Sequence, residues 1–197
     1  AIGYQAGDAL TTGGGNVVIG HGAFSAEDTG SNHVAIGKSA LAVLNIGGNS
    51  NVAIGLNSLA ANVSGGNNTA IGTNTLAAQN TSGTAADTHN TAVGNSAGAS
   101  VTSGISNTLI GSISGDAITT GTNNVAMGVS SLSTDTAGQF SVAIGANALA
   151  TQNFSTSTDV YNTAVGLSAG RLVTTGDQNT LIGGLAGDAL TTGRRNS

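Results

Sequence analysis

The sequence predicts an all-β protein built as a parallel β-solenoid, in which each coil of the chain stacks only on its neighbours. A five-residue phrase recurs eleven times in the 197 residues, for example as NVAIG at 51–55 and NTAVG at 90–94. Counted along the chain, the intervals between the glycines that close it are 17 or 18, except for two of 22 and 21, and such a period is typical of solenoids. Five aromatic residues and 32 glycines cannot fill one globular centre, so we expect a thin, linear core.

Each coil is numbered here from its closing glycine, which takes position 0. These glycines are Gly3, Gly20, Gly37, Gly55, Gly72, Gly94, Gly111, Gly128, Gly145, Gly166 and Gly183. The sequence thus predicts eleven coils, each of about 17 residues, stacked as in other repeat architectures. The whole chain, 1–197, reads as one repeat domain, which we expect to be a segment of a longer fibre.

A short strand is expected just before each closing glycine. Position −1 is always a large aliphatic residue and position −3 is always Val or Thr, so their side chains point the same way on an extended strand. We expect these two positions to line the inside of the coil. Position −2 is mostly Ala and would then face outward as a long apolar stripe. A second chain is expected to cover that stripe.

In the segment that follows each closing glycine, positions +4 and +7 are complementary in size: a large side chain at one goes with a small or polar residue at the other. Where position +4 is Gly, position +7 is a large aliphatic residue, as in Gly98 and Val101; where +4 is Leu or Phe, +7 is polar, as in Leu76 and Gln79. We interpret this as room for one large side chain per coil. Position +10 is Gly in nine coils, which predicts a corner with positive φ.

Two coils carry insertions, at about 82–89 and 155–161. After each insertion the pattern restarts, and residues 90–124 match residues 162–196 at 23 of 35 positions. A unit of four coils is therefore itself repeated.

Position −4 is an Asn column. Its members are Asn16, Asn51, Asn68, Asn90, Asn107, Asn124, Asn162 and Asn179, interrupted by His33 and Ser141. A row of exposed amides could bind sugars. We favour the alternative, a stacked ladder in which each amide bonds the next coil at the strand spacing of ~4.8 Å.

Composition excludes several function classes. Charged residues make up 7% and the net charge is −5, which repels phosphate backbones, so no nucleic-acid partner is expected. The chain has no Cys and no apolar run of membrane-spanning length, so we expect neither thiolate metal sites nor membrane insertion.

The phrase SVAIG at 141–145 resembles the head repeat of trimeric autotransporter adhesins of the YadA type. The longer phrase NTAVGLSAGRLVTTGDQNTLIG at 162–183 resembles the repeats of tail-fibre proteins from phages and other large viruses. The resemblance implies a left-handed parallel β-roll and a homotrimer. It also implies an extracellular protein, in a virion tail fibre or on a cell surface, that mediates or spaces attachment to a host glycan or protein.

No catalytic residue, cofactor or metal site is expected. Catalysis needs a convergent group of titratable residues, whereas His21, His33 and His89 lie in three different coils. One alternative function is ice binding, indicated by TTG at 11–13, 119–121, 174–176 and 191–193, although Asp28, Asn45 and Val63 interrupt that column. A polysaccharide-active enzyme of the β-helix type is the third alternative.

If the segment itself contacts a receptor, the insertions are the expected place, because solenoid insertions form exposed loops. They also contain the residues that packing explains least. The candidate receptor contacts are Asp87, His89, Phe154, Asp159 and Tyr161.

Overall fold

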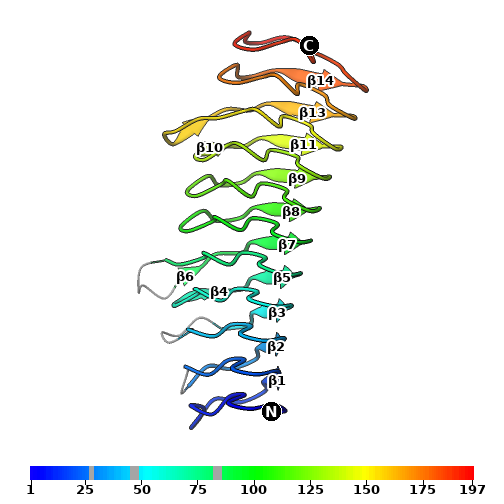
Figure 1. The fold of residues 1–197 in the computed structure, drawn as a ribbon. Coiled ribbons are helices and arrows are strands. Elements are labelled where there is room, and N and C mark those ends of the chain that lie inside the picture. Colours follow the sequence, from blue (N-terminus) through cyan, green and yellow to red (C-terminus); the bar gives the residue numbers. More distant parts are fainter. Residues whose placement is uncertain (27–28, 45–48, 82–85) are drawn as a thin grey trace.

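The computed structural model describes the whole chain except residues 27–28, 45–48 and 82–85. Its described residues form fourteen short strands and no helix. Ten of the strands make one parallel sheet that runs the length of the molecule (Figure 1). In sheet order they are β1 (Val17–Ile19), β2 (Val34–Ile36), β3 (Val52–Ile54), β5 (Thr69–Ile71), β7 (Thr91–Val93), β8 (Thr108–Ile110), β9 (Val125–Met127), β11 (Val142–Ile144), β13 (Thr163–Val165) and β14 (Thr180–Ile182).

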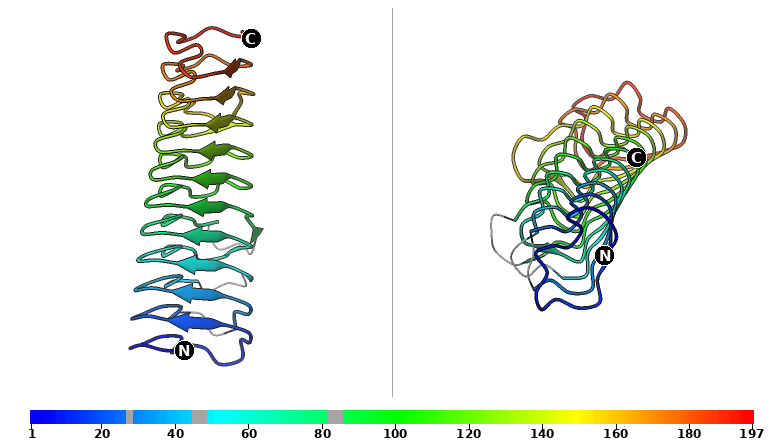
Figure 2. Two further views of the ribbon diagram at one scale, coloured as in Figure 1. Left: turned by 90° about the vertical axis from the view of Figure 1, so that its right-hand side faces the viewer. Right: turned by 60° about the horizontal axis from the view of Figure 1, so that its bottom comes forward.

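The register of this sheet repeats from coil to coil. Strand β3 pairs with β5 through Val52 and Thr69, Ala53 and Ala70, and Ile54 and Ile71, so equal positions of the repeat lie side by side. The predicted parallel β-solenoid is therefore confirmed, with about nine turns between β1 and β14. The first of the eleven predicted coils adds only a bridge between Ile2 and Ile19. The two chain ends lie at opposite ends of a long rod (Figure 2).

Two small strand pairs stand beside this sheet at the insertions. In the first, β4 (Gly65–Gly66) pairs in parallel with β6 (Ala86–Asp87), and in the second, β10 (Gly138–Gln139) pairs with β12 (Thr158–Asp159). Part of the first predicted insertion, residues 82–85, lies outside the described residues. In each pair, the inserted segment is hydrogen-bonded to the preceding coil, as the strands of the main sheet are to one another.

The faces of the main sheet are opposite to those the sequence predicted. Position −2 points inward: Ala35, Ala53 and Ala143 are completely buried. Positions −1 and −3 point outward, and Val17 and Ile71 are 46% and 37% exposed. The prediction was wrong because it gave the interior to the larger side chains of the strand. The expected cover over the Ala stripe is therefore not needed.

The opposite wall of the coil explains this arrangement. Leu or Phe at position +4, such as Leu59 and Leu76, is completely buried and fills much of the interior, which leaves little room at position −2, where Ala53 and Ala70 stand in these two coils. Leu109 replaces that Ala where Gly98 and Gly115 stand opposite; a Cβ on either glycine would lie 2.7 Å from a Leu109 methyl carbon. Close packing thus decides from which wall each large side chain comes.

Glycine is required at the two repeated positions for two different structural reasons. All eleven closing glycines have φ between 126° and 140°, where L side chains are strained. The described glycines at position +10 do not have positive φ, so that prediction was wrong. They are needed for close approach between coils, since a Cβ on Gly104 would lie 2.4 Å from the carbonyl oxygen of Gly121.

Candidate binding surfaces

The Asn column is an internal ladder and not a binding surface. The Asn107 side chain is completely buried. Its Oδ1 accepts a hydrogen bond from the Asn124 backbone N–H at 3.0 Å, and its Nδ2 donates to the Gly121 carbonyl at 2.9 Å and to Asn90 Oδ1 at 3.2 Å. The ladder interpretation is confirmed, and its buried amides are occupied by the neighbouring coils.

The two interruptions of the ladder are filled by other polar groups. His33 Nδ1 accepts from the Asn51 backbone N–H at 3.2 Å. Ser141 Oγ accepts from Gln152 Nε2 at 2.9 Å, and Gln152 Oε1 accepts from Asn162 Nδ2 at 2.9 Å. Gln152 at position +7 therefore replaces the amide that Ser141 lacks.

Asp135 is a buried carboxylate beside this substitution. Burial raises the pKa of Asp135, and hydrogen bonds from the Phe154 backbone and the Gln152 side chain oppose the rise in part. Its Oδ1 accepts from the backbone N–H groups of Gly138 and Phe154 at 3.1 and 3.0 Å. Asp135 thereby fixes the chain where the second insertion begins.

The outer face of the main sheet is the largest candidate surface. Every strand presents Val or Thr at position −3 and Ile, Val or Met at position −1, without a charged residue. Nine strand steps of ~4.8 Å make this face about 43 Å long. Figure 2 shows the strands aligned along one side of the rod. At position +1, Leu56, Val129 and Leu167 are exposed and extend the apolar surface past the closing glycine in three coils, whereas other coils hold polar residues there, such as Lys38 and Asn95.

The threonines that indicated ice binding are partly used by the fold. Hydroxyl groups at position +8 donate to main-chain carbonyls of the next coil: Thr119 Oγ1 to Thr136 at 3.0 Å and Thr174 Oγ1 to Thr191 at 3.2 Å. Two interrupting residues, Asp28 and Asn45, lie outside the described residues. The Thr119 and Thr174 hydroxyl groups are therefore engaged within the fold and do not form a regular array of free hydroxyl groups.

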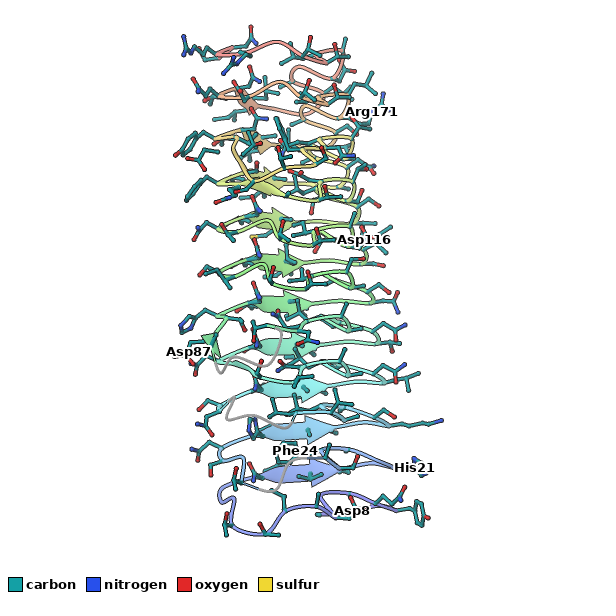
Figure 3. The ribbon with its side chains drawn as sticks, turned by 90° about the vertical axis from the view of Figure 1, so that its left-hand side faces the viewer. Asp8, His21, Phe24, Asp87, Asp116 and Arg171 are labelled. Atoms are coloured by element: carbon teal, nitrogen blue, oxygen red, sulfur yellow. The ribbon has the colours of Figure 1, made fainter. Side chains whose placement is uncertain are left out.

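The predicted receptor residues belong to two separate insertions. Asp87 and His89 are exposed at the first, and Asp87, the last residue of β6, lies at the outer edge of the solenoid (Figure 3). Asp159 and Tyr161 are exposed at the second, where the Tyr161 hydroxyl donates to Asp159 Oδ2 at 3.3 Å. The repeat places the two pairs four coils apart on the same edge.

Phe154 has a different environment from the other four. Its ring is only partly exposed, and its backbone N–H and carbonyl are both bonded, to Asp135 and to the Ala137 N–H at 3.0 and 2.8 Å. The second insertion is therefore anchored through the main chain of Phe154.

Sequence reasoning missed one residue of this surface. Phe140 stacks on Tyr161 with ring centroids 5.2 Å apart and ring planes inclined by 11°. Both rings stand at position −5 of adjacent coils, one strand spacing apart. Reading position −5 as a column would have placed Phe140 beside Tyr161.

Within the described residues no group of three or more acidic, His or Cys side chains could hold a metal ion, and no pocket was found. The described chain contains no helix that could cross a membrane. His21 stacks on Tyr4, and His33 contacts Phe24 with the two ring planes inclined by 52°, so these two histidines have separate environments. Comparisons with protein-family models, curated proteins and solved structures found no match to this chain.

Proposed function

We propose that this chain is a non-enzymatic structural and adhesive segment of an extracellular trimeric fibre, in a virion tail fibre or a cell-surface adhesin. Its role is to mediate or space attachment to a host. The observation that carries the proposal is the outer face of the main sheet, which along about nine turns carries no charged residue and presents Ile, Val or Met at position −1 and Val or Thr at position −3. A monomer would expose an apolar patch far longer than soluble monomers tolerate.

A homotrimer covers this surface better than a dimer. Two sheets packed face to face would cover positions −3 and −1 but leave at the rim the three large aliphatic residues of position +1, Leu56, Val129 and Leu167. Three rods around a common axis let each rod contact one neighbour through the sheet face and another through the flank beside it. Closed cyclic symmetry also avoids open-ended association. The resemblance of the repeat to fibre proteins agrees with a left-handed β-roll.

The assembly is tested by placing a charge on the sheet face. Ile54→Lys and Ile144→Lys should lower the mass from three chains to one while the β circular dichroism signal remains, because each buries an unpaired charge between chains. Light scattering gives the mass. Thr120→Lys is the matched control, since Thr120 is exposed away from this face. Wild-type protein that is a stable monomer would overturn the trimer.

Attachment is tested with the labelled segment on a panel of bacteria and cultured eukaryotic cells. Saturable binding to a subset of cells is expected, without hydrolysis of their polysaccharides. Thermal hysteresis without cell binding would instead indicate the ice-binding alternative, and saccharide turnover would indicate the enzyme.

A further inference from the structure

We infer that the second insertion carries a binding site for a neutral saccharide, built on the stacked rings of Phe140 and Tyr161. This inference rests on the proposed attachment function and assigns its ligand class. The two rings are 36% and 51% exposed. They make up two of only five Phe and Tyr residues in the chain, so their pairing on the outside is not a consequence of composition.

Position −5 has a left-handed backbone in every coil that contains it, and no coil other than these two has Phe or Tyr there. Phe140 and Tyr161 have φ of 59° and 53°, in the left-handed region that bulky residues rarely adopt. The same position in the other coils holds Gly15 or a polar residue (Asn, Ser, His or Gln), the polar residues with φ of 51° to 62°. Asn is well suited to this conformation. Two aromatic rings here replace a residue that would fit the turn better.

Polar groups border the rings in the arrangement that a sugar needs. Asp159 accepts from the Tyr161 hydroxyl through Oδ2 and forms no ion pair with any residue in the described part of the chain. Gln139 pairs with Asp159 across β10 and β12. Thr122 donates to Gln139 at 2.8 Å, and Gln139 in turn bonds Ser157 in the insertion. An apolar ring surface flanked by an acceptor and by amide and hydroxyl groups matches the C–H and hydroxyl groups of a pyranose.

The charge of the site selects among saccharides. Asp159 is exposed and the net charge of the chain is −5, so sialic acids, uronic acids and phosphorylated sugars would be repelled. The first insertion repeats the same pattern, with Asp87 and His89 at the positions of Asp159 and Tyr161. In a trimer these sites would act together on a repeating glycan, where avidity raises the affinity.

The test uses an array of neutral oligosaccharides of glucose, galactose, mannose and N-acetylglucosamine, followed by calorimetry with the best binder. Phe140→Asn and Tyr161→Asn should weaken binding at least tenfold and leave the melting temperature unchanged or higher. The control is Tyr4→Asn, which removes an exposed ring from the other outward stack, that of Tyr4 and His21. This control should bind like the unmodified segment.

Two results would overturn the inference while leaving attachment intact: cell binding without binding to any neutral saccharide, and saccharide binding that survives both Asn substitutions. A change of mass in the Asn variants would also overturn it, because the rings would then be an assembly contact. If the segment binds neither saccharides nor cells, the attachment function fails together with the site.

Discussion

At the scale of single residues, Asp135 shows how a repeat position accepts a charge. Position +7 of another coil holds Asn62, whose Oδ1 accepts from the Gly65 N–H at 2.7 Å and whose Nδ2 donates to the Gly65 carbonyl at 2.8 Å. Asp135 accepts from Gly138 in the same way. The carboxylate therefore has an uncharged precedent in the same fold, and its charge is the feature that distinguishes it, because Asn62 and Asp135 are both buried.

The free energy of unfolding should depend on pH through Asp135. Because burial raises its folded-state pKa above the ordinary 3.8, the folded protein favours the neutral carboxyl. Its contribution to stability is therefore greatest below that ordinary value and falls as the pH rises through the raised pKa. Asp135→Asn should remove this dependence on pH, while it also loses the acceptor that Asp135 Oδ2 offers to Gln152 Nε2, which costs on the order of 1 kcal/mol at every pH. Urea unfolding at several pH values measures it.

The control for this prediction is Asp8→Asn, because Asp8 is exposed. Its unfolding curve should follow that of the unmodified protein across the same pH range. A variant at Asp135 that is destabilised equally at every pH would show that the hydrogen bonds to Gly138 and Phe154 matter more than the charge.

At the scale of elements, the strand positions were predictable and their faces were not. The eleven glycines and the β-branched residues before them mark every strand of the main sheet. Both faces of these strands are largely apolar, so the pattern alone does not show which face is buried. The sequence-based prediction placed the face with the larger side chains in the core. The decision is made by the facing wall, where Leu59 or Leu76 fills the interior. The sequence did hold a sign of the buried face: a large residue at position −2, Leu109, occurs where the facing position +4 is Gly, at Gly98 and Gly115.

The Asn ladder should contribute as much as the apolar core of a coil. Asn107→Ala would leave the buried Asn124 N–H and Gly121 carbonyl without their side-chain partner. Leaving buried groups unpaired costs about 1–3 kcal/mol each, so a loss of roughly 2–6 kcal/mol is expected in chemical unfolding. Asn95→Ala is the control, since Asn95 is exposed and its side chain bonds only the adjacent Ser96 hydroxyl. Equal losses in the two variants would contradict a structural ladder.

At the scale of the whole molecule, the period of the sequence was sufficient to predict the architecture. Each coil contacts only its neighbours, so local pattern and global fold carry the same information. The candidate receptor site was less predictable, because stacking between Phe140 and Tyr161 joins a regular coil to an inserted one. A search for residues that break the period finds Tyr161 but passes over Phe140.

The repeated four-coil unit should be removable as a block. Deleting residues 90–161 joins His89 to Asn162. In the intact chain Gly170 packs against Leu149, and in the shortened chain Leu76 would take the place of Leu149. The fit is conserved: a Cβ on Gly98 would lie 2.9 Å from Leu76 Cδ2, and one on Gly170 would lie 2.9 Å from Leu149 Cδ2. The shortened chain should therefore fold cooperatively as a shorter rod, measured by thermal unfolding and small-angle scattering.

The control deletion removes residues 90–170, which takes out half a coil more and puts the Asn column and closing glycines out of phase. It should yield an unfolded or aggregated chain, because the glycines would no longer face each other where the coils approach most closely. If both deletions fold equally well, the register of the repeat does not hold the solenoid together. If neither folds, the coils depend on contacts beyond their nearest neighbours, and the one-dimensional description of this molecule fails.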